Sequence, residues 1–396
     1  MRNRKRSKFK RIIFVVSLCC VGILVYRHVF RNYLLLEPFE NQPSWSPDGR
    51  RIAYICLRRQ RTRDRRIGVH FAPYAGYDQS SLQEVCILDL DQNQRRQVTE
   101  DSIVHIAPVW SSDGSQIAYL SGPRVTKTDI HVVKSDDWLS STNLTHNPGS
   151  YGELLWPPTD EYLASTTTGE DLQRQLIVVS LRDRNIISLS EIPATGDYTW
   201  SPNGDSIAFV QGKYPVNNVY TVSVPGGEIK QLTHQPSAWY DDLTWLPDGD
   251  HIAYTTYRPA EDPYLDTGKQ IRILSLGTLS ETILPIPLTR HDVYWSPDGR
   301  FLCYAAGQME SEHLRIWDRD KQSLLVYPDI GWIVSLEWSP DSDRLLVTRL
   351  DDWNNDEHTE PKLWLLEIET GRLIPLSGWF PWYQQETKID HVRYDD

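Results

Sequence analysis

The sequence predicts an all-β fold, a seven-bladed β-propeller with four-stranded blades, preceded by an N-terminal hydrophobic helix. Three observations favour this fold class: a motif that recurs seven times, a spacing between copies that is mostly in the forties, and a composition that suits strands. The 396-residue chain contains 15 Trp and 20 Tyr but only 2 Met. Large aromatic residues are enriched in strands, so the composition agrees with the repeat.

Each copy of the motif places a Trp before a turn sequence and a short apolar strand, as in "SWSPDGRRIAY" at residues 44–54. In Ser-Pro-Asp-Gly, Pro presets φ for a type I turn, Ser and Asp cap local amides, and Gly accepts a positive φ. Where Gly is missing, Asp160 and Ser342 take its place. We expect every Trp to be a core wedge between neighbouring blades. The seven copies are Trp45, Trp110, Trp156, Trp200, Trp245, Trp295 and Trp338, at intervals of 65, 46, 44, 45, 50 and 43 residues.

Two further strands follow each motif and complete a blade of four strands. The fourth ends near a Leu or Val followed by Thr or Ser, as in "QVTED" and "NLTHN". The seven units fill residues 40–380, and the tail at 381–396 or the segment Tyr33–Phe39 could supply a closing strand. The expected third strands are 85–90, 129–135, 176–181, 219–224, 271–276, 314–319 and 363–368.

The repeated Trp, Ser-Pro-Asp-Gly turn and Ile-Ala-aromatic strand resemble the TolB-like (WD40-like) propeller repeat family. The resemblance covers about residues 40–380 and implies the propeller fold. It does not imply one activity, because this repeat serves translocation proteins, protease gating domains and carbohydrate enzymes.

The N-terminus predicts export. Residues 1–37 carry a net charge of +8, and an apolar run follows the first seven basic residues. We expect a basic cytoplasmic segment at 1–11, a signal-anchor transmembrane helix at 12–30 and a linker at 31–39. A cleaved signal peptide is the alternative. In both cases the propeller lies on the extracytoplasmic side, at the cell surface or in the periplasm.

The charge and the cysteine content limit which partners, disulfides and metal sites are expected. The total charge of −12 leaves −20 for residues 38–396, so nucleic acid is not an expected partner. Among five Cys, Cys56 and Cys86 are the one candidate disulfide pair, near the facing ends of two strands of the first blade. Two buried free thiols are the alternative. No CxxC spacing for zinc is present.

The candidate ligand-binding residues stand three positions before the motif Trp, where the first strand of each blade enters the channel mouth. Four consecutive blades have a carboxylate there, with Asp241 and His291 beside them. Facing carboxylates at Asp197, Asp242 and Asp292 could hold Ca²⁺ or grip a basic peptide end. The alternative is that they are solvated acids that cap the turn into the strand. The candidates are Glu153, Asp197, Asp242, Asp292, Asp241 and His291.

Two functions remain open. Insertions in the loops between second and third strands, at 57–83, 255–269 and 350–361, predict that this face binds a protein or peptide partner. The other hypothesis is a cation-dependent propeller enzyme, a lyase or hydrolase acting on a sugar or lactone at the acidic channel mouth. No P-loop, HExxH, G-x-G-x-x-G or nucleophile elbow is present, so no catalytic residue or cofactor other than Ca²⁺ is predicted. We expect a monomer.

Overall fold

The computed structural model describes most of the chain from residue 37 onward, in segments. These are 37–38, 43–59, 81–101, 103–124, 126–146, 149–168, 174–190, 194–213, 216–234, 239–257, 269–286, 292–308, 311–328, 330–350, 362–376, 387–388 and 392–395. Two compact units are present, of which one comprises Pro38–Cys56 and Gln83–Asp396 and contains the propeller. No helix within these segments has the length and apolar character needed to cross a membrane. The predicted anchor at 12–30 lies outside the described residues.

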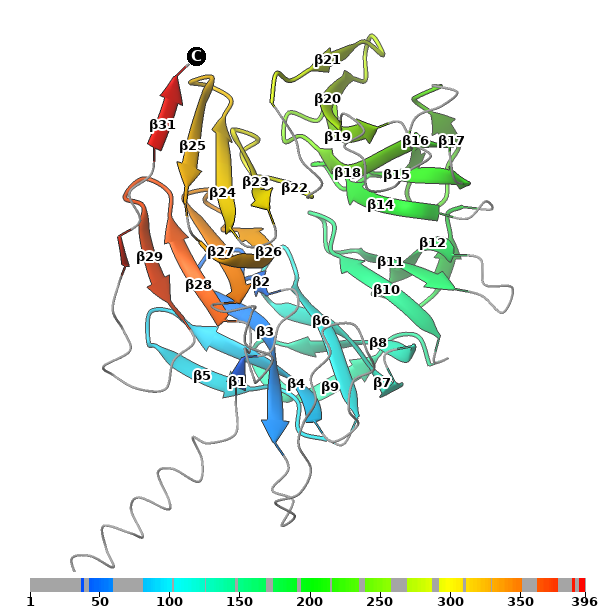
Figure 1. The fold of residues 1–396 in the computed structure, drawn as a ribbon. Coiled ribbons are helices and arrows are strands. Elements are labelled where there is room, and N and C mark those ends of the chain that lie inside the picture. The colour runs from blue at the N-terminus through cyan, green and yellow to red at the C-terminus, as the bar shows by residue number, and fades with distance from the viewer. Residues whose placement is uncertain are drawn as a thin grey trace, which may run out of the picture. The chain divides into compact units, whose positions relative to one another are not determined.

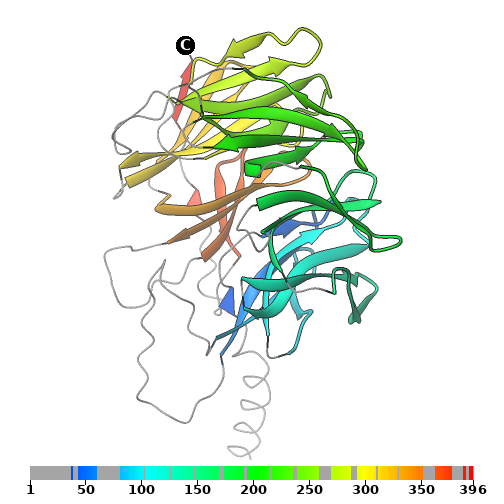
Figure 2. The ribbon, with the colours of Figure 1, turned by 90° about the vertical axis from the view of Figure 1, so that its right-hand side faces the viewer.

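The propeller unit consists of seven antiparallel sheets that follow one another in chain order (Figure 1 and Figure 2). The first four sheets each come from one continuous stretch of sequence. Sheet 1 contains β1 (Glu37–Pro38), β2 (Ser44–Trp45), β3 (Arg51–Arg59), β4 (Ser81–Asp89) and β5 (Gln94–Gln97). Sheet 2 contains β6 (Val104–Trp110), β7 (Gln116–Arg124), β8 (Lys127–Lys134) and β9 (Asp137–Asn143). Sheet 3 contains β10 (Ser150–Leu155), β11 (Tyr162–Thr168), β12 (Arg174–Ser180) and β13 (Ile186–Ser188). Sheet 4 contains β14 (Ala194–Trp200), β15 (Ser206–Lys213), β16 (Val216–Ser223) and β17 (Ile229–Gln231).

The remaining three sheets have the same plan, and two of them carry an extra strand from the C-terminal tail. Sheet 5 contains β18 (Trp239–Trp245), β19 (His251–Tyr257), β20 (Gln270–Ser275) and β21 (Glu281–Ile283). Sheet 6 contains β22 (Val293–Trp295), β23 (Phe301–Gln308), β24 (Ser311–Asp318), β25 (Ser323–Tyr327) and β31 (Val392–Asp395). Sheet 7 contains β26 (Trp332–Trp338), β27 (Arg344–Leu350), β28 (Lys362–Glu367), β29 (Arg372–Pro375) and β30 (Thr387–Lys388). The predicted seven-bladed propeller is therefore confirmed.

The turn between first and second strands has the predicted geometry. In the first blade the amide of Gly49 donates to the carbonyl of Ser46 at 2.8 Å, and the Ser46 hydroxyl donates to Asp48 at 2.5 Å. Gly49 has φ +66°, a conformation that Gly adopts without steric cost. Asp160 and Ser342 have φ of 52° and 62°, so these residues do occupy the glycine position.

The hydrophobic core lies between blades rather than within them. Each of six buried clusters in the described part of the chain contains residues of two consecutive blades. Four motif indoles are members of these clusters: Trp110, Trp200, Trp295 and Trp338. These four and Trp45 are only 5–8 % exposed. Their predicted role as wedges between blades is confirmed for these five, while Trp156 and Trp245 are half-buried.

A recurrent hydrogen bond joins motif indoles to the preceding blade. The Nε1 of Trp200 donates to the carbonyl of Leu155 at 3.1 Å, and Leu155 directly precedes the Trp of blade 3. Trp156 and Trp338 make the same bond to Val109 and Tyr294, at 3.1 and 3.0 Å. Trp45 makes it across the ring junction, to the carbonyl of Glu337 at 3.4 Å.

Blades 1 and 7 therefore meet through side chains, and among the described residues no strand is exchanged between their sheets. The guanidinium of Arg344 lies 5.0 Å from the Trp45 ring and donates to the carbonyl of Gly49 at 3.2 Å. The tail does supply strands, but to the outer edges of blades 6 and 7, where β31 pairs with β25 and β30 with β29.

The Thr or Ser after the fourth strand ties that strand back to the third. The Thr99 hydroxyl accepts from the amide of Val85 at 2.9 Å and donates to the buried Glu84 carboxylate at 2.7 Å. Equivalent bonds to a third-strand amide are made by Thr145, Ser190 and Thr233. The recurrent "LT" and "LS" pairs thus have a structural role.

Cys56 and Cys86 form a disulfide, with their Cα atoms 5.9 Å apart. Both cysteines are fully buried, and the bond joins the second and third strands of blade 1. Of the two alternatives that the sequence left open, a disulfide or two free thiols, the structure contains the disulfide. Cys303 is a buried free thiol.

Replacing Trp200 by Phe should lower the free energy of unfolding more than replacing Trp245 by Phe. W200F removes a hydrogen bond between blades, whose net contribution is about 1 kcal/mol. The Trp245 indole instead donates to Gly249 within its own turn, so W245F is the matched control. Urea unfolding measures both, and equal losses would contradict a stabilising role for the bond between blades.

Candidate functional site

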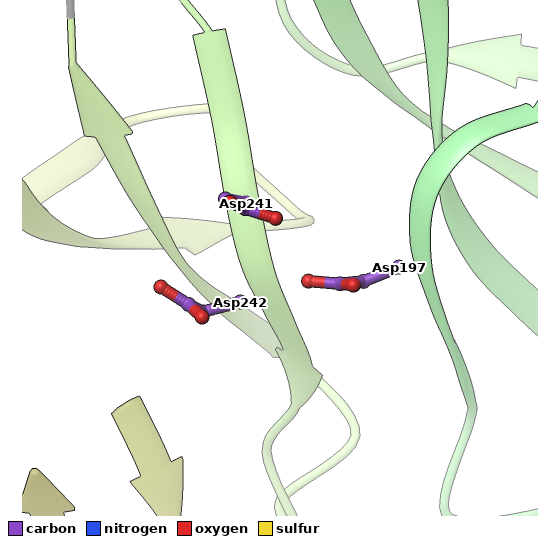
Figure 3. A group of neighbouring side chains, drawn as sticks. All are labelled: Asp197, Asp241 and Asp242. Carbon is purple, nitrogen blue, oxygen red and sulfur yellow. The ribbon is translucent and has the colours of Figure 1, made fainter. Parts of the chain in front are cut away.

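The candidate site lies on the first strands of blades 4 and 5, where three aspartates come together. One carboxylate oxygen from each of Asp197, Asp241 and Asp242 lies within 4.8 Å of the other two. Figure 3 shows Asp197 reaching from β14 toward the two aspartates of β18. This group of three, here called the Asp cluster, is the one possible metal-binding group of His, Cys, Asp and Glu found among the described residues.

A β-bulge explains how two consecutive residues of one strand contribute to the same cluster. Neighbouring side chains on a regular strand point to opposite faces. The register of β18 against β19 shifts between Asp241 and Thr244, and Asp242 has a left-handed φ of 51°. Bulges of this kind break the alternation of a strand, and here one carboxylate oxygen of each of the two consecutive aspartates lies within 4.8 Å of Asp197.

The bulge recurs at the same place in other blades. The register of the first strand is also irregular around Ala107, Glu153 and Asp197, each three residues before its motif Trp. The position three residues before the Trp is therefore where the first strand is irregular in these blades. The spacing in the sequence was enough to single it out.

Two side chains from blade 4 hold the bulge of blade 5 from either side. The fully buried Asn217 accepts from the amide of Tyr240 at 2.7 Å and donates to the Tyr240 carbonyl at 3.0 Å. The Asp197 carboxylate accepts from the amide of Leu243 at 3.3 Å. The backbone on both sides of the two aspartates is thus fixed by the neighbouring blade.

Asp242 has strong partners of its own. Its Oδ2 accepts the hydroxyl of Thr255 at 2.6 Å and lies 2.7 Å from the ammonium Nζ of Lys269. The side chains of Asp242 and Lys269 are only 6 % and 10 % exposed. Lys269 follows the connection between β19 and β20, so the Asp cluster lies toward the blade ends that carry these connections, away from the Ser-Pro-Asp-Gly turns.

Mutual repulsion and loss of water raise the pKa of the other two members. Desolvation, and then the charges of Asp197 and Asp242, raise the pKa of Asp241 to about 7. Desolvation and the charge of Asp242 raise the pKa of Asp197 as well. The Asp cluster therefore holds a proton for part of the time near neutral pH.

Two glutamates on the first strands of other blades add to the negative charge around the Asp cluster. Desolvation, with repulsion from Glu153 second, raises the pKa of Glu337 on β26 to about 8. Desolvation, with repulsion from Asp197 second, raises the pKa of Glu153 on β10. Both glutamates also reach solvent, and water screens part of this repulsion. The innermost strands thus present negative charge that is only partly compensated.

The structure brings only some of the predicted site residues together. Asp197, Asp241 and Asp242 form the cluster, while Glu153 lies on the neighbouring blade and Asp292 is exposed at the start of β22. Among the described residues the close group consists of Asp197, Asp242 and Asp241, and the predicted Asp292 is not part of it. His291 lies outside the described residues, as does most of each loop insertion. Sequence reasoning missed Lys269, Thr255, Asn217 and Glu337.

Seven antiparallel sheets, each built on four consecutive strands, with a charged group on the first strands of two of them, define a β-propeller protein with a candidate binding site. The chain belongs to the TolB beta propeller domain family, whose model matches residues 68–340. The family resemblance of the motif is thereby confirmed.

Several known proteins are similar to the chain. The "uncharacterized peptidase YuxL" of Bacillus subtilis is 28% identical over 244 residues, which are 55% of this chain and 32% of that protein. The chain thus spans about a third of the length of this curated relative. An oligogalacturonate lyase in complex with manganese has a TM-score of 0.61 at 16% identity, covering 83% and 89% of the two chains. The β-propeller domain of the Trilobed protease from Pyrococcus furiosus, described as having an open velcro topology, has a TM-score of 0.59 at 15% identity, covering 87% and 96%. These structural likenesses concern the fold.

Stability should fall as the pH rises from about 5 to 8. Asp241 has an ordinary pKa of 3.8 and a folded value of about 7, so the folded state binds more protons within that window and loses this advantage as they dissociate. Glu337 extends the effect to about pH 8. The Asp241→Asn variant should flatten the fall of Tm below pH 7, and Glu337→Gln should flatten its upper part.

Thermal unfolding in buffers of equal ionic strength measures this dependence. Asp136→Asn removes an exposed aspartate of blade 2 and is the control. A slope that is the same in Asp241→Asn as in the wild type would show that Asp241 does not take up the proton.

Proposed function

We propose that the protein is a membrane-anchored, extracytoplasmic propeller that binds a protein or peptide partner through the face that carries its long loops. The Asp cluster supports this proposal most directly, because its three carboxylates lie close together, with the buried Lys269 paired to Asp242, and contacts between blades fix the backbone around them. A basic side chain or an amino terminus of the partner would supply the positive charge that the cluster lacks.

The extracytoplasmic location is supported by two features. The strongly basic start followed by an apolar run is typical of an export signal or anchor. A buried disulfide is typical of proteins that fold in an oxidising compartment.

A second candidate is a cation-dependent enzyme acting on a sugar or lactone. The spacing of the three aspartate oxygens favours it, since carboxylate oxygens bind hard divalent cations. A lyase with the same fold was solved in complex with manganese. Binding of a monovalent basic group is preferred over binding of a divalent cation, because the ammonium group of Lys269 already lies in the site and repels a divalent ion more strongly.

Protein isolated from its own cells without reductant should carry Cys56 and Cys86 in one disulfide-linked peptide pair, because the export machinery would deliver it to an oxidising compartment. Mass spectrometry of a non-reducing digest detects the pair, with cysteines alkylated at lysis to prevent later oxidation. The same chain expressed without residues 1–30 in a reducing cytoplasm is the control. Both cysteines alkylated in the native protein would contradict the proposed location.

A basic peptide should bind the wild type and lose most of its affinity when the Asp cluster is neutralised. We expect an oligo-arginine peptide to bind at least about tenfold more weakly to Asp197→Asn/Asp241→Asn/Asp242→Asn, the loss of about 1.4 kcal/mol. The binding should also weaken with salt.

Calorimetry measures this affinity, and a matched variant controls for net charge. Replacing three exposed aspartates, Asp91, Asp136 and Asp250, by Asn changes the charge equally but leaves the cluster intact. If both triple variants lose affinity to the same extent, the peptide responds to overall charge and the proposed site is wrong.

A further inference from the structure

The Asp cluster already contains a cation, the ammonium group of Lys269. Its Nζ lies 2.7 Å from Asp242 Oδ2, and that oxygen also accepts the hydroxyl of Thr255. With about nine-tenths of the Lys269 side chain buried, water screens this ion pair less than a surface pair.

This ion pair changes what else the cluster can bind. A Ca²⁺ ion needs six to eight oxygen ligands at about 2.3–2.6 Å. A metal bound to Asp242 would lie close to the Lys269 ammonium, and two positive charges at that separation in a partly buried site repel strongly. One oxygen of Asp242 is already committed to two donors, and one oxygen of Asp197 accepts the amide of Leu243.

A monovalent cationic group meets neither obstacle to the same degree. An ammonium group has three N–H donors and a guanidinium group five, and either can leave some of them to water, so the neighbouring carboxyl groups of Asp197 and Asp241 can serve as its acceptors. Its repulsion from Lys269 is about half that of a divalent ion.

We propose that Lys269 determines the specificity of this site: its ammonium neutralises Asp242, so that the Asp cluster accepts one further ammonium or guanidinium group and rejects divalent metal ions. This inference rests on the proposed function and adds the chemical class of the group that is bound. It also identifies Lys269 as the residue that separates the two candidate functions.

The test compares wild type with Lys269→Met, using CaCl₂, MnCl₂ and an oligo-arginine peptide as probes. The two metal salts should leave the Tm of the wild type unchanged. Lys269→Met should gain a saturable rise of Tm with at least one of them, because the freed carboxylate and the missing repulsion create a metal site. Lys321→Met is the matched control, since Lys321 pairs with Asp318 at 3.7 Å outside the cluster.

Saturable metal binding by the wild type that is lost in Asp242→Asn would overturn the inference. So would a folded Lys269→Met variant that gains no metal binding. If Lys269→Met does not fold, Lys269→Gln retains a polar group and addresses the same question, and the wild-type measurement needs no variant. If the peptide fails to bind while Lys269→Met gains a metal, the proposed partner is wrong and the role of Lys269 stands.

Discussion

The contact between each motif indole and the preceding blade is the interaction on which the rest of the structure depends. A blade of four short strands cannot bury its faces alone, and the buried clusters accordingly lie between blades. The bond from Trp45 to Glu337 closes the ring with the same geometry that Trp200 uses within it. Among the described strands none is exchanged between the first and last blades, which meet through this bond and the contacts of Arg344 with Trp45 and Gly49.

The same packing between blades places the functional groups. Like charges repel, and three aspartates on flexible loops would separate. Here Asn217 and Asp197 of blade 4 hold the backbone on both sides of Asp241 and Asp242. The raised pKa of Asp241 reflects the energy stored in this arrangement. Such a charge arrangement lowers stability, and its presence in a well-packed ring favours a role in binding over a role in folding.

The sequence predicted the fold almost completely because its signals are local. A Trp, a turn and an apolar strand lie within eleven residues, and even the replacement of Gly by Asp160 and Ser342 could be recognised. Counting back from the Trp also identified the bulge position of Asp197 and Asp242. The partners could not be predicted in this way, since Lys269 reaches the site from a different strand. Asp241 joined the cluster only because the bulge breaks the alternation of the strand.

The location of Lys269 bears on how a propeller of this family can bind without a metal. A group of carboxylates with no internal cation would be a general acceptor for hard cations. With one ammonium fixed beside Asp242, the remaining charge is small and directional, and it is carried by Asp197 and Asp241 alone. Protonation of Asp241 reduces that charge further. In the proposed complex with a basic group, binding and proton release are therefore linked, and the affinity rises with pH over the range in which Asp241 titrates.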